Sequence, residues 1–398
     1  MPLVPFIGLL FAYSLASARL ERTVFTAPII FTLAGCGTYF IMRPGIGRLE
    51  SGAFLKLAEI GLVLLLFTDA SRTGLKILRN IRELPARLLS VGMLLTILLG
   101  TLAALWVFPQ FSFWEAGILA AILAPTDAGL GQIIVNSPLV PMKVRQALNV
   151  EAGLNDGLSV PFLLFFIAMA SAESGDGGFA RFIGEQLGLG FAVGAVAGLG
   201  GGWLLNAARR HEWMAESFLQ LAVVSLPVFC LMSSEPVGAS PFIAAFVAGL
   251  CVQVTFKHAG KHSVEFTEEW GQILNLSVFF LFGMIVGMES GSIPPQAAIY
   301  AVLSLTVVRM LPVAVSLIGS GLDKATVAFM GWFGPRGLAS IVLGLVYLEQ
   351  EQHLPGEQAT RHAVMLTVLL SILAHGLTAA PGIRWLSRRS THPHPTKP

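Results

Sequence analysis

One stretch of the sequence, residues 145–170, constrains the fold more than any other. It reads RQALNVEAGLNDGLSVPFLLFFIAMA, and it is longer than the about 20 residues that a helix needs to cross a bilayer. Its first half nevertheless carries Glu151, Asn155 and Asp156. A carboxylate at the centre of a membrane helix costs about 2.5–3.5 kcal/mol on insertion scales, so such residues usually serve a function. We therefore interpret this span as part of a site for a cation or a proton.

Helical geometry separates these polar side chains onto two faces. Glu151 and Asn155 are four residues apart and share a face. Asp156 is turned by about 100° from Asn155. Ala152 and Ser159 lie about one turn away from Asp156 on its own face. We expect Asp156 to face a cavity, whereas Glu151 and Asn155 face a neighbouring helix.

The composition is that of a polytopic, all-α membrane protein. The chain has 398 residues, of which 55% are hydrophobic and 12% charged, and its mean hydropathy is +0.74. A soluble domain has about 25% charged residues, so a soluble enzyme is excluded. The net charge of +2 gives no reason to expect a nucleic-acid partner. No nucleotide-binding motif is visible, so we expect no cofactor, and the first apolar run is expected to stay as a helix rather than be removed as a signal peptide.

Thirteen apolar spans are predicted along the sequence. They begin near Pro5, Phe25, Gly52, Pro85, Phe113, Arg145, Ala180, Glu216, Gly238, Trp270, Gln296, Asp323 and Arg361. The last span ends near Leu386, and residues 388–398 are expected to form a short disordered tail without room for a further domain. The two histidines of the tail are compatible with metal binding, but a disordered end is the favoured interpretation.

The basic residues of the loops predict the orientation in the cell (inner) membrane. Of the 25 Lys and Arg residues, most lie in loops that follow odd-numbered spans. The loops after even-numbered spans hold only Arg43, Arg48, Lys56, Arg181 and Arg361. We therefore expect the N-terminus outside and the C-terminus in the cytoplasm, with residues 72–87 as the strongest cytoplasmic marker.

Two spans are interrupted by proline and glycine. Span 5 reads FWEAGILAAILAPTDAGLGQIIV, with breaks at Pro125 and Gly129, and span 12 reads KATVAFMGWFGPRGLASIVLGLV, with Pro335 between two glycines. Irregular backbone is tolerated in a membrane only where it lines a cavity or is buried in protein. Two interrupted spans in corresponding positions indicate inverted repeats, here spans 1–6 and 8–13, that cross at a transport site. Proline and glycine are common in membrane helices, but the matched positions favour the transporter.

Several other polar or small residues inside the spans call for an explanation. Arg309 and Arg336 lie in spans 11 and 12, and each must be paired, hydrated or directed at helix C-termini because arginine keeps its charge. Asp69 is interpreted either as a second polar group near the site or as a helix end. His375 is interpreted as a hydrogen-bonded interior histidine rather than a proton relay. A glycine stripe in span 7 favours close helix packing, with a dimer face as one possibility; its members are Gly190, Gly194, Gly198 and Gly202.

Five motifs together resemble the NhaP-type bacterial sodium/proton antiporters. These belong to the monovalent cation–proton antiporter superfamily, along with the eukaryotic sodium–hydrogen exchangers. The motifs are APTDAGLG at 124–131, NVEAGLNDG at 149–157, PFIAAFVAGL at 241–250, VVRMLPV at 307–313 and GPRGLAS at 334–340. The resemblance covers essentially the whole transmembrane chain.

The resemblance implies an architecture of thirteen transmembrane helices and a homodimer. Broken helices 5 and 12 would cross within a mobile core, which moves against a dimer scaffold. The implied divisions are scaffold helices 1–3 in residues 1–83, core helices 4–6 in 84–172, connector helix 7 with scaffold helices 8–10 in 173–290, core helices 11–13 in 291–387, and the cytoplasmic tail in 388–398.

The resemblance also implies an ion site. Asp156 would bind Na⁺ or H⁺, and Thr126 and Asp127 would contribute oxygen atoms directly or through water. The family often has serine directly after the glutamate, but this chain has Ala152. Ser159 or water would then supply the missing oxygen.

Four further residues have supporting roles in this resemblance. Asn155 would hold helix 6 to the crossover. Glu151 would pair with an arginine, for which Arg309 is favoured, while Arg336 would offset the half-helix ends at the crossover or be the partner of Glu151 instead. Proline often follows the Thr-Asp pair in relatives, whereas this chain has Ala128.

The implied function is secondary transport, not enzymatic catalysis. One Na⁺ (or Li⁺) would exchange for one H⁺ at Asp156 by alternating access across the lipid bilayer. Because Asn155 carries no proton, the exchange is expected to be electroneutral. The alternatives are a K⁺/H⁺ antiporter, which Ala152 makes plausible, and a sodium-coupled symporter of an organic anion on a similar fold.

Overall fold

The described residues of the computed structural model are 3–20, 23, 25–42, 51–72, 83–173, 184–256, 261–291, 293–349 and 354–390. Within these ranges the chain is helical and has no strand, so the all-α prediction is confirmed. The loop residues Arg43, Arg48 and Arg181 lie outside the described residues, as do most of the run 72–87 and the end of the tail.

Helices lie in each predicted span as far as the structure describes it, and the predicted start of span 7 near Ala180 lies outside the described residues. The first half contains α1 (Leu3–Leu20), α2 (Ala27–Met42), α3 (Ser51–Arg72), α5 (Glu83–Arg87), η1 (Leu88–Gly92), α6 (Met93–Val107), α7 (Phe113–Ile122), α8 (Ala128–Val135) and α9 (Met142–Glu173). The second half contains η2 (Gly184–Leu189), α11 (Gly190–Arg210), α12 (Glu216–Ser234), η3 (Glu235–Val237), α13 (Pro241–Thr255), α14 (Lys261–Glu289), α15 (Pro295–Leu305), α16 (Val307–Ser316), α17 (Lys324–Trp332), α18 (Leu338–Glu349) and α19 (Glu357–Ser390). Eight helical stretches in the described part of the chain are long and apolar enough to cross a membrane, and shorter apolar helices accompany them.

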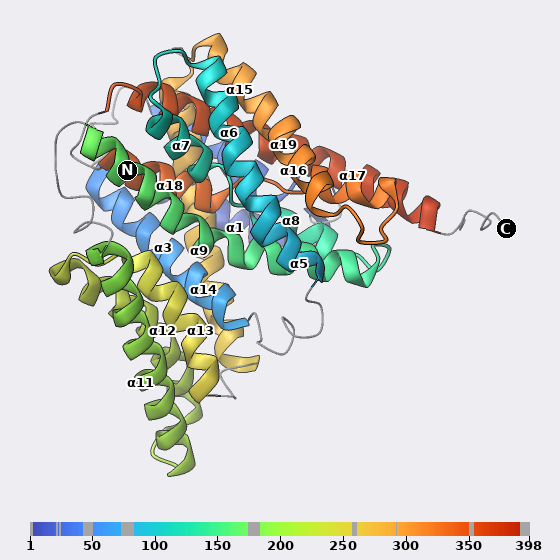
Figure 1. Cartoon of the computed structure of the whole chain (residues 1–398). Helices are drawn as coiled ribbons and strands as arrows, with labels where there is room; N and C mark the ends of the chain where they lie inside the picture. Colours follow the sequence, from blue (N-terminus) through green and yellow to red (C-terminus); the bar gives the residue numbers. More distant parts are fainter. Residues whose placement is uncertain are drawn as a thin grey trace.

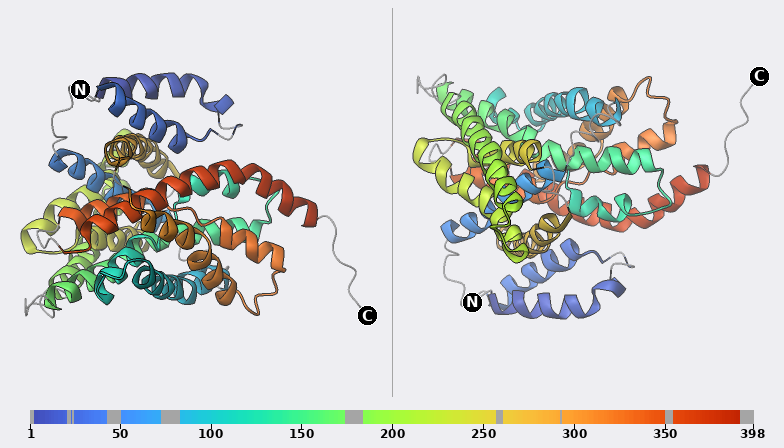
Figure 2. Two further views of the ribbon diagram at one scale, coloured as in Figure 1. Left: turned by 90° about the horizontal axis from the view of Figure 1, so that it is seen from above. Right: turned by 90° about the horizontal axis from the view of Figure 1, so that it is seen from below.

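The helices pack in two groups. In the first group, α11 packs on α13, α13 on α3, and α2 on α14. In the second group, α7 lies between α6 and α9, and α15 lies along α19. Figure 1 shows α11, α12 and α13 at one end of the molecule and α6, α7 and α15 at the other. Helices α1 and α2 form a hairpin along one side (dark blue in Figure 2).

The glycine stripe of α11 serves packing inside the protomer. A Cβ atom added at Gly194 would lie 2.3 Å from the carbonyl oxygen of Ala244, and one added at Gly198 would lie 2.5 Å from that of Ala248. Both carbonyls belong to α13, so the two helix backbones touch. The stripe is therefore buried against α13, and the interpretation of these glycines as a dimer face is wrong.

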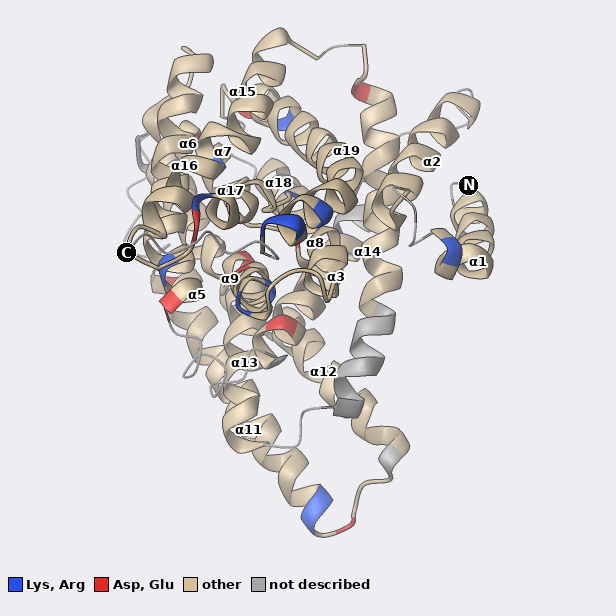
Figure 3. Ribbon diagram, turned by 90° about the vertical axis from the view of Figure 1, so that its right-hand side faces the viewer, with Lys and Arg blue, Asp and Glu red and all other residues tan. Residues whose placement is uncertain are grey.

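Charged side chains are sparse along the helices, as the mostly tan ribbon of Figure 3 shows. Five of the buried ones gather near the middle of the second group, and they lie on α9, on α16 and at the two helix breaks. They are Asp127, Glu151, Asp156, Arg309 and Arg336. A cluster of this kind in an apolar interior is expected to be paired or functional.

Candidate functional site

Two interrupted helices meet at the centre of this cluster. Helix α7 ends at Ile122 and α8 begins at Ala128, while α17 ends at Trp332 and α18 begins at Leu338. The two irregular segments contact each other directly, because the amide of Asp127 donates to the carbonyl of Pro335 at 2.8 Å. The backbone groups released by each break are therefore partly satisfied by the other break.

Asp127 caps the N-termini of both half-helices. Its Oδ1 accepts the amide of Leu130 in α8 at 2.8 Å, and its Oδ2 accepts the amide of Leu338 in α18 at 2.6 Å. The positive ends of two helix dipoles thus converge on one carboxylate. Gly337 allows this approach, since a Cβ atom there would lie 2.1 Å from Oδ2.

Arg336 lies at the C-terminal end of α7. Its Nη1 donates to the carbonyls of Ala124 and Pro125 at 2.9 and 3.0 Å. Its own amide donates to Oγ of Ser371 in α19 at 2.6 Å. The guanidinium is completely buried, and it sits where the carbonyls at the end of a helix favour a cation.

Of the two arginines considered as partners of Glu151, Arg309 forms the ion pair. Nη1 of Arg309 lies 2.6 Å from Oε1 of Glu151, and Nη2 lies 3.0 Å from Oε2. Both side chains are buried. Arg309 also lies against the second break, because a Cβ atom added at Gly334 would be 2.2 Å from its Nε.

Asn155 connects α9 to the first break. Its Nδ2 donates to Oγ1 of Thr126 at 2.7 Å. The neighbouring Asp156 is 4% exposed, and its Oδ1 is buried without a hydrogen-bond partner. Ser159 donates its hydroxyl hydrogen to the backbone carbonyl of Asp156 at 2.8 Å, so the structure directs it at the backbone rather than at the carboxylate.

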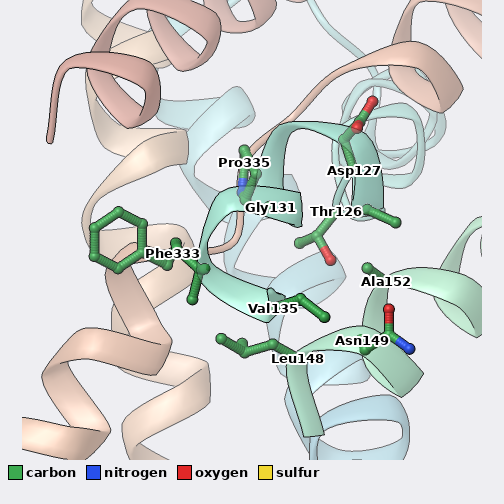
Figure 4. Close-up of a pocket in the computed structure, with 11 residues that line it drawn as sticks. Thr126, Asp127, Gly131, Val135, Leu148, Asn149, Ala152, Phe333 and Pro335 are labelled. Carbon is green, nitrogen blue, oxygen red and sulfur yellow. The ribbon is translucent and has the colours of Figure 1, made fainter. Parts of the chain in front are cut away.

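A cavity lies beside the first break, between α8, the first half of α9 and the second break. Its lining residues are Thr126, Asp127, Ala128, Gly131, Ile134, Val135, Leu148, Asn149, Ala152, Phe333 and Pro335. Figure 4 shows Thr126 between Asp127 and Ala152, with the carboxylate of Asp127 directed away from Ala152. The cavity thus reaches the position where the resemblance led us to expect a serine.

Two more polar residues lie near this site. Asn149 was not predicted from the sequence, and Asp69 was given two alternative interpretations. Asn149 lines the cavity, and its position three residues before Ala152 on the same helix face could have revealed it. Asp69 of α3 is close enough to Asp156 for the two charges to interact, as is Asp127. Asp69 also lies in the last turn of α3, so it is a helix-end residue as well as an acid near the site.

Comparisons with known proteins match this chain to a family of transporters. A family model described as "Sodium/hydrogen exchanger, transmembrane" matches residues 6–385. The chain is 25% identical over 390 residues to the K⁺/H⁺ antiporter NhaP of Alkalimonas amylolytica, a match covering 96% of this chain and 66% of that protein. It is 24% identical over 343 residues to the K⁺/H⁺ antiporter NhaP2 of Shewanella baltica, covering 84% and 58%. The chain thus matches less than two thirds of the length of these curated relatives.

Solved structures share the fold. The sodium proton antiporter MjNhaP1 from Methanocaldococcus jannaschii at pH 8 superimposes with a TM-score of 0.73 at 19% identity, covering 98% of this chain and 99% of that one. An electron-microscopy structure of the same antiporter gives a TM-score of 0.71 at 17% identity, covering 100% and 98%. The arrangement of helices around the two breaks is therefore that of a known transporter fold.

Proposed function

Because the chain belongs to the sodium/hydrogen exchanger family, we propose that it exchanges Na⁺ for H⁺ across the membrane at Asp156. Family and fold are those of cation/proton antiporters and not of enzymes. The observation that carries the proposal is the contrast between two carboxylates of α9. Glu151 is neutralised by Arg309, whereas Asp156 is buried with an unsatisfied oxygen and forms no ion pair among the described residues.

The proposed ion ligands are oxygen atoms around the first break. Na⁺ is a hard cation and, like calcium and magnesium, prefers oxygen. Asp156 provides the carboxylate, Thr126 a hydroxyl, and water the remaining ligands. The lining of the cavity described above includes Thr126 but not Asp156, which we had expected to face a cavity. Asp127 contributes through its charge and through water, because both of its oxygens already accept backbone amides. Ser159 steadies the backbone of Asp156.

The exchange follows from competition for one negative charge. Either a proton or a cation neutralises Asp156, and a neutral site crosses the apolar interior at far lower cost than a charged one. Glu151 and Arg309 remain paired throughout, and Asn155 carries no proton. One Na⁺ therefore exchanges for one H⁺, and no net charge crosses the membrane in a cycle.

The proposed moving part is the helix group that carries the site. Helices α5 to α9 and α15 to α19 would form this core, and the remaining helices would form the scaffold of a homodimer. In this proposal thirteen crossings are built from two inverted repeats, with the N-terminus outside and the C-terminus in the cytoplasm. The cavity beside Thr126 is lined by α8 and α9, which are joined by segment 136–141 on the side that this proposal makes cytoplasmic.

Potassium is the second candidate ion. Two relatives are named K⁺/H⁺ antiporters, and Ala152 places a methyl group in the cavity where a hydroxyl would bind Na⁺. A site with fewer strong ligands discriminates less against the larger and more weakly hydrated K⁺.

The proposal is tested by ion-driven proton movement in reconstituted vesicles. A pH-sensitive dye inside proteoliposomes would report alkalinisation or acidification when Na⁺, Li⁺ or K⁺ is added in turn. We expect a response to Na⁺ and Li⁺ that is lost in Asp156→Asn and kept in Glu115→Gln, which alters a buried carboxylate at the start of α7. A response to K⁺ alone would select the second candidate. Full activity of Asp156→Asn would contradict the proposal.

A further inference from the structure

A buried histidine holds the end of the second broken helix. His375 of α19 is 3% exposed, and its Nε2 lies 2.8 Å from the carbonyl oxygen of Trp332, the last residue of α17. A carbonyl can only accept, so the bond to Trp332 forms in the tautomer that carries hydrogen on Nε2, and in that tautomer Nδ1 accepts the hydroxyl hydrogen of Ser371. The imidazole also stacks on the Trp332 indole, with ring centroids 5.2 Å apart.

The other ring nitrogen of His375 is connected to the first break through Ser371 and Arg336. Nδ1 of His375 lies 2.8 Å from the carbonyl oxygen and 3.2 Å from Oγ of Ser371. The same Oγ accepts the amide of Arg336. Arg336 in turn donates to the carbonyls at the end of α7. A continuous hydrogen-bonded path therefore joins the C-terminal ends of α17 and α7.

Each broken helix needs such a partner for a physical reason. The last carbonyls of a half-helix are acceptors that have no N–H donor within the helix, and they carry the negative end of its dipole. Lipid cannot satisfy them. Arg336 fills this role for α7, and His375 shares it with the Gly334 amide at the Trp332 carbonyl of α17. Asp127 caps the two N-termini.

We propose that His375 is a positioning residue of the ion site. By fixing Trp332 with one nitrogen and Ser371 with the other, it sets where Arg336 meets the end of α7. Thr126 and Asp127 follow directly after that end, so the position of His375 determines where two of the proposed cation-binding residues stand. The transport test of this inference rests on the proposed function, whereas the hydrogen–deuterium exchange test does not.

A second hydrogen bond between α17 and α19 provides a matched control for the loss of helix packing alone. Nε1 of Trp332 donates to Oγ1 of Thr378 at 2.9 Å, which fastens the same end of α17 to the same helix α19. Within the described part of the chain, Thr378 bonds neither Ser371 nor Arg336, and its hydroxyl donates instead to the carbonyl of Ala374. Thr378→Val therefore removes a comparable bond between α17 and α19 without touching the path to α7.

The transport test compares the apparent KM and kcat for Na⁺ in proteoliposomes. We expect His375→Ala and Ser371→Ala to raise KM by about tenfold, as loss of a residue that orients metal ligands does, with a smaller effect on kcat. His375→Gln should recover most of the loss, because its amide nitrogen can donate to Trp332. Thr378→Val should lower thermal stability and leave KM unchanged. Equal KM effects of Thr378→Val and His375→Ala would overturn the proposal.

A second measurement is independent of transport. Hydrogen–deuterium exchange of purified protein reports the amide of Asp127, which is bonded to Pro335 across the two breaks. His375→Ala should speed exchange in peptides covering both breaks, and Thr378→Val only in the peptide at the end of α17. Unchanged exchange around Asp127 in His375→Ala would refute the positioning role, even if the wild-type protein transported no cation. Ser371→Ala, which removes the acceptor of Arg336, carries the same test if His375→Ala does not fold.

Discussion

Arg309 and Glu151 face each other through two parallel hydrogen bonds, 2.6 and 3.0 Å long, between α16 and α9. The geometry is the bidentate one that arginine forms with carboxylates. Because both side chains are buried, neither charge is exposed to the surrounding apolar protein without its counterpart. The pair thus joins α9 to α16 beside the second break. Asp156, the proposed ion site, has no such ion pair among the described residues.

Breaking this pair from one side should be more harmful than removing it altogether. Glu151→Gln or Arg309→Gln leaves one buried charge uncompensated, which costs about 3–5 kcal/mol. The double variant Glu151→Gln/Arg309→Gln should be more stable than either single variant. Thermal unfolding followed by tryptophan fluorescence in detergent measures all three. A double variant whose loss equals the sum of the single losses would show that the pair is not coupled.

Electroneutral exchange predicts that the rate does not depend on membrane potential. In proteoliposomes clamped with valinomycin and potassium gradients, Na⁺-driven proton flux should be the same at inside-negative and inside-positive potentials. The reason is that Asn155, beside Asp156, cannot carry a second proton. A sodium-dependent current on a solid-supported membrane would rule out one-for-one exchange.

Gly337 should tolerate no side chain. A Cβ atom there would overlap Oδ2 of Asp127, so Gly337→Ala must displace the carboxylate that caps α8 and α18. We expect loss of exchange and a destabilisation of about 1–3 kcal/mol, as for other overpacked sites. Gly200→Ala in α11 is the control, because no atom lies within 4 Å of its Cβ position. Exchange by Gly337→Ala at the wild-type rate would show that this cap is dispensable.

Ala152→Ser should shift ion preference towards Na⁺. The added hydroxyl would enter the cavity beside Thr126 and supply one more oxygen ligand. A tenfold lower KM for Na⁺ relative to K⁺ corresponds to about 1.4 kcal/mol, the scale of one added polar contact. Measuring KM for both ions with the same vesicles checks this. An unchanged ratio would mean that water already fills the position of the serine hydroxyl.

The sequence by itself determined the class of the protein and the location of its irregular segments. The apolar spans follow from composition along the chain, and the breaks near Pro125 and Pro335 follow from residues that cannot continue a helix. Both signals are local, so no tertiary information is needed to interpret them. Asp156 could be identified for the same reason, because placing an acidic side chain within an apolar span costs free energy wherever the span packs.

Tertiary structure alone decided which partner each of these groups has. Helical periodicity placed Glu151 on a face but did not choose between Arg309 and Arg336, since Glu151 and Arg309 are 158 residues apart in the chain. It also did not reveal that Asp127 caps two helices, or that His375 holds the end of α17. Such contacts depend on how helices that are distant in sequence cross each other and which faces they present. That arrangement minimises the burial of unpaired polar groups over the whole molecule rather than within any one segment.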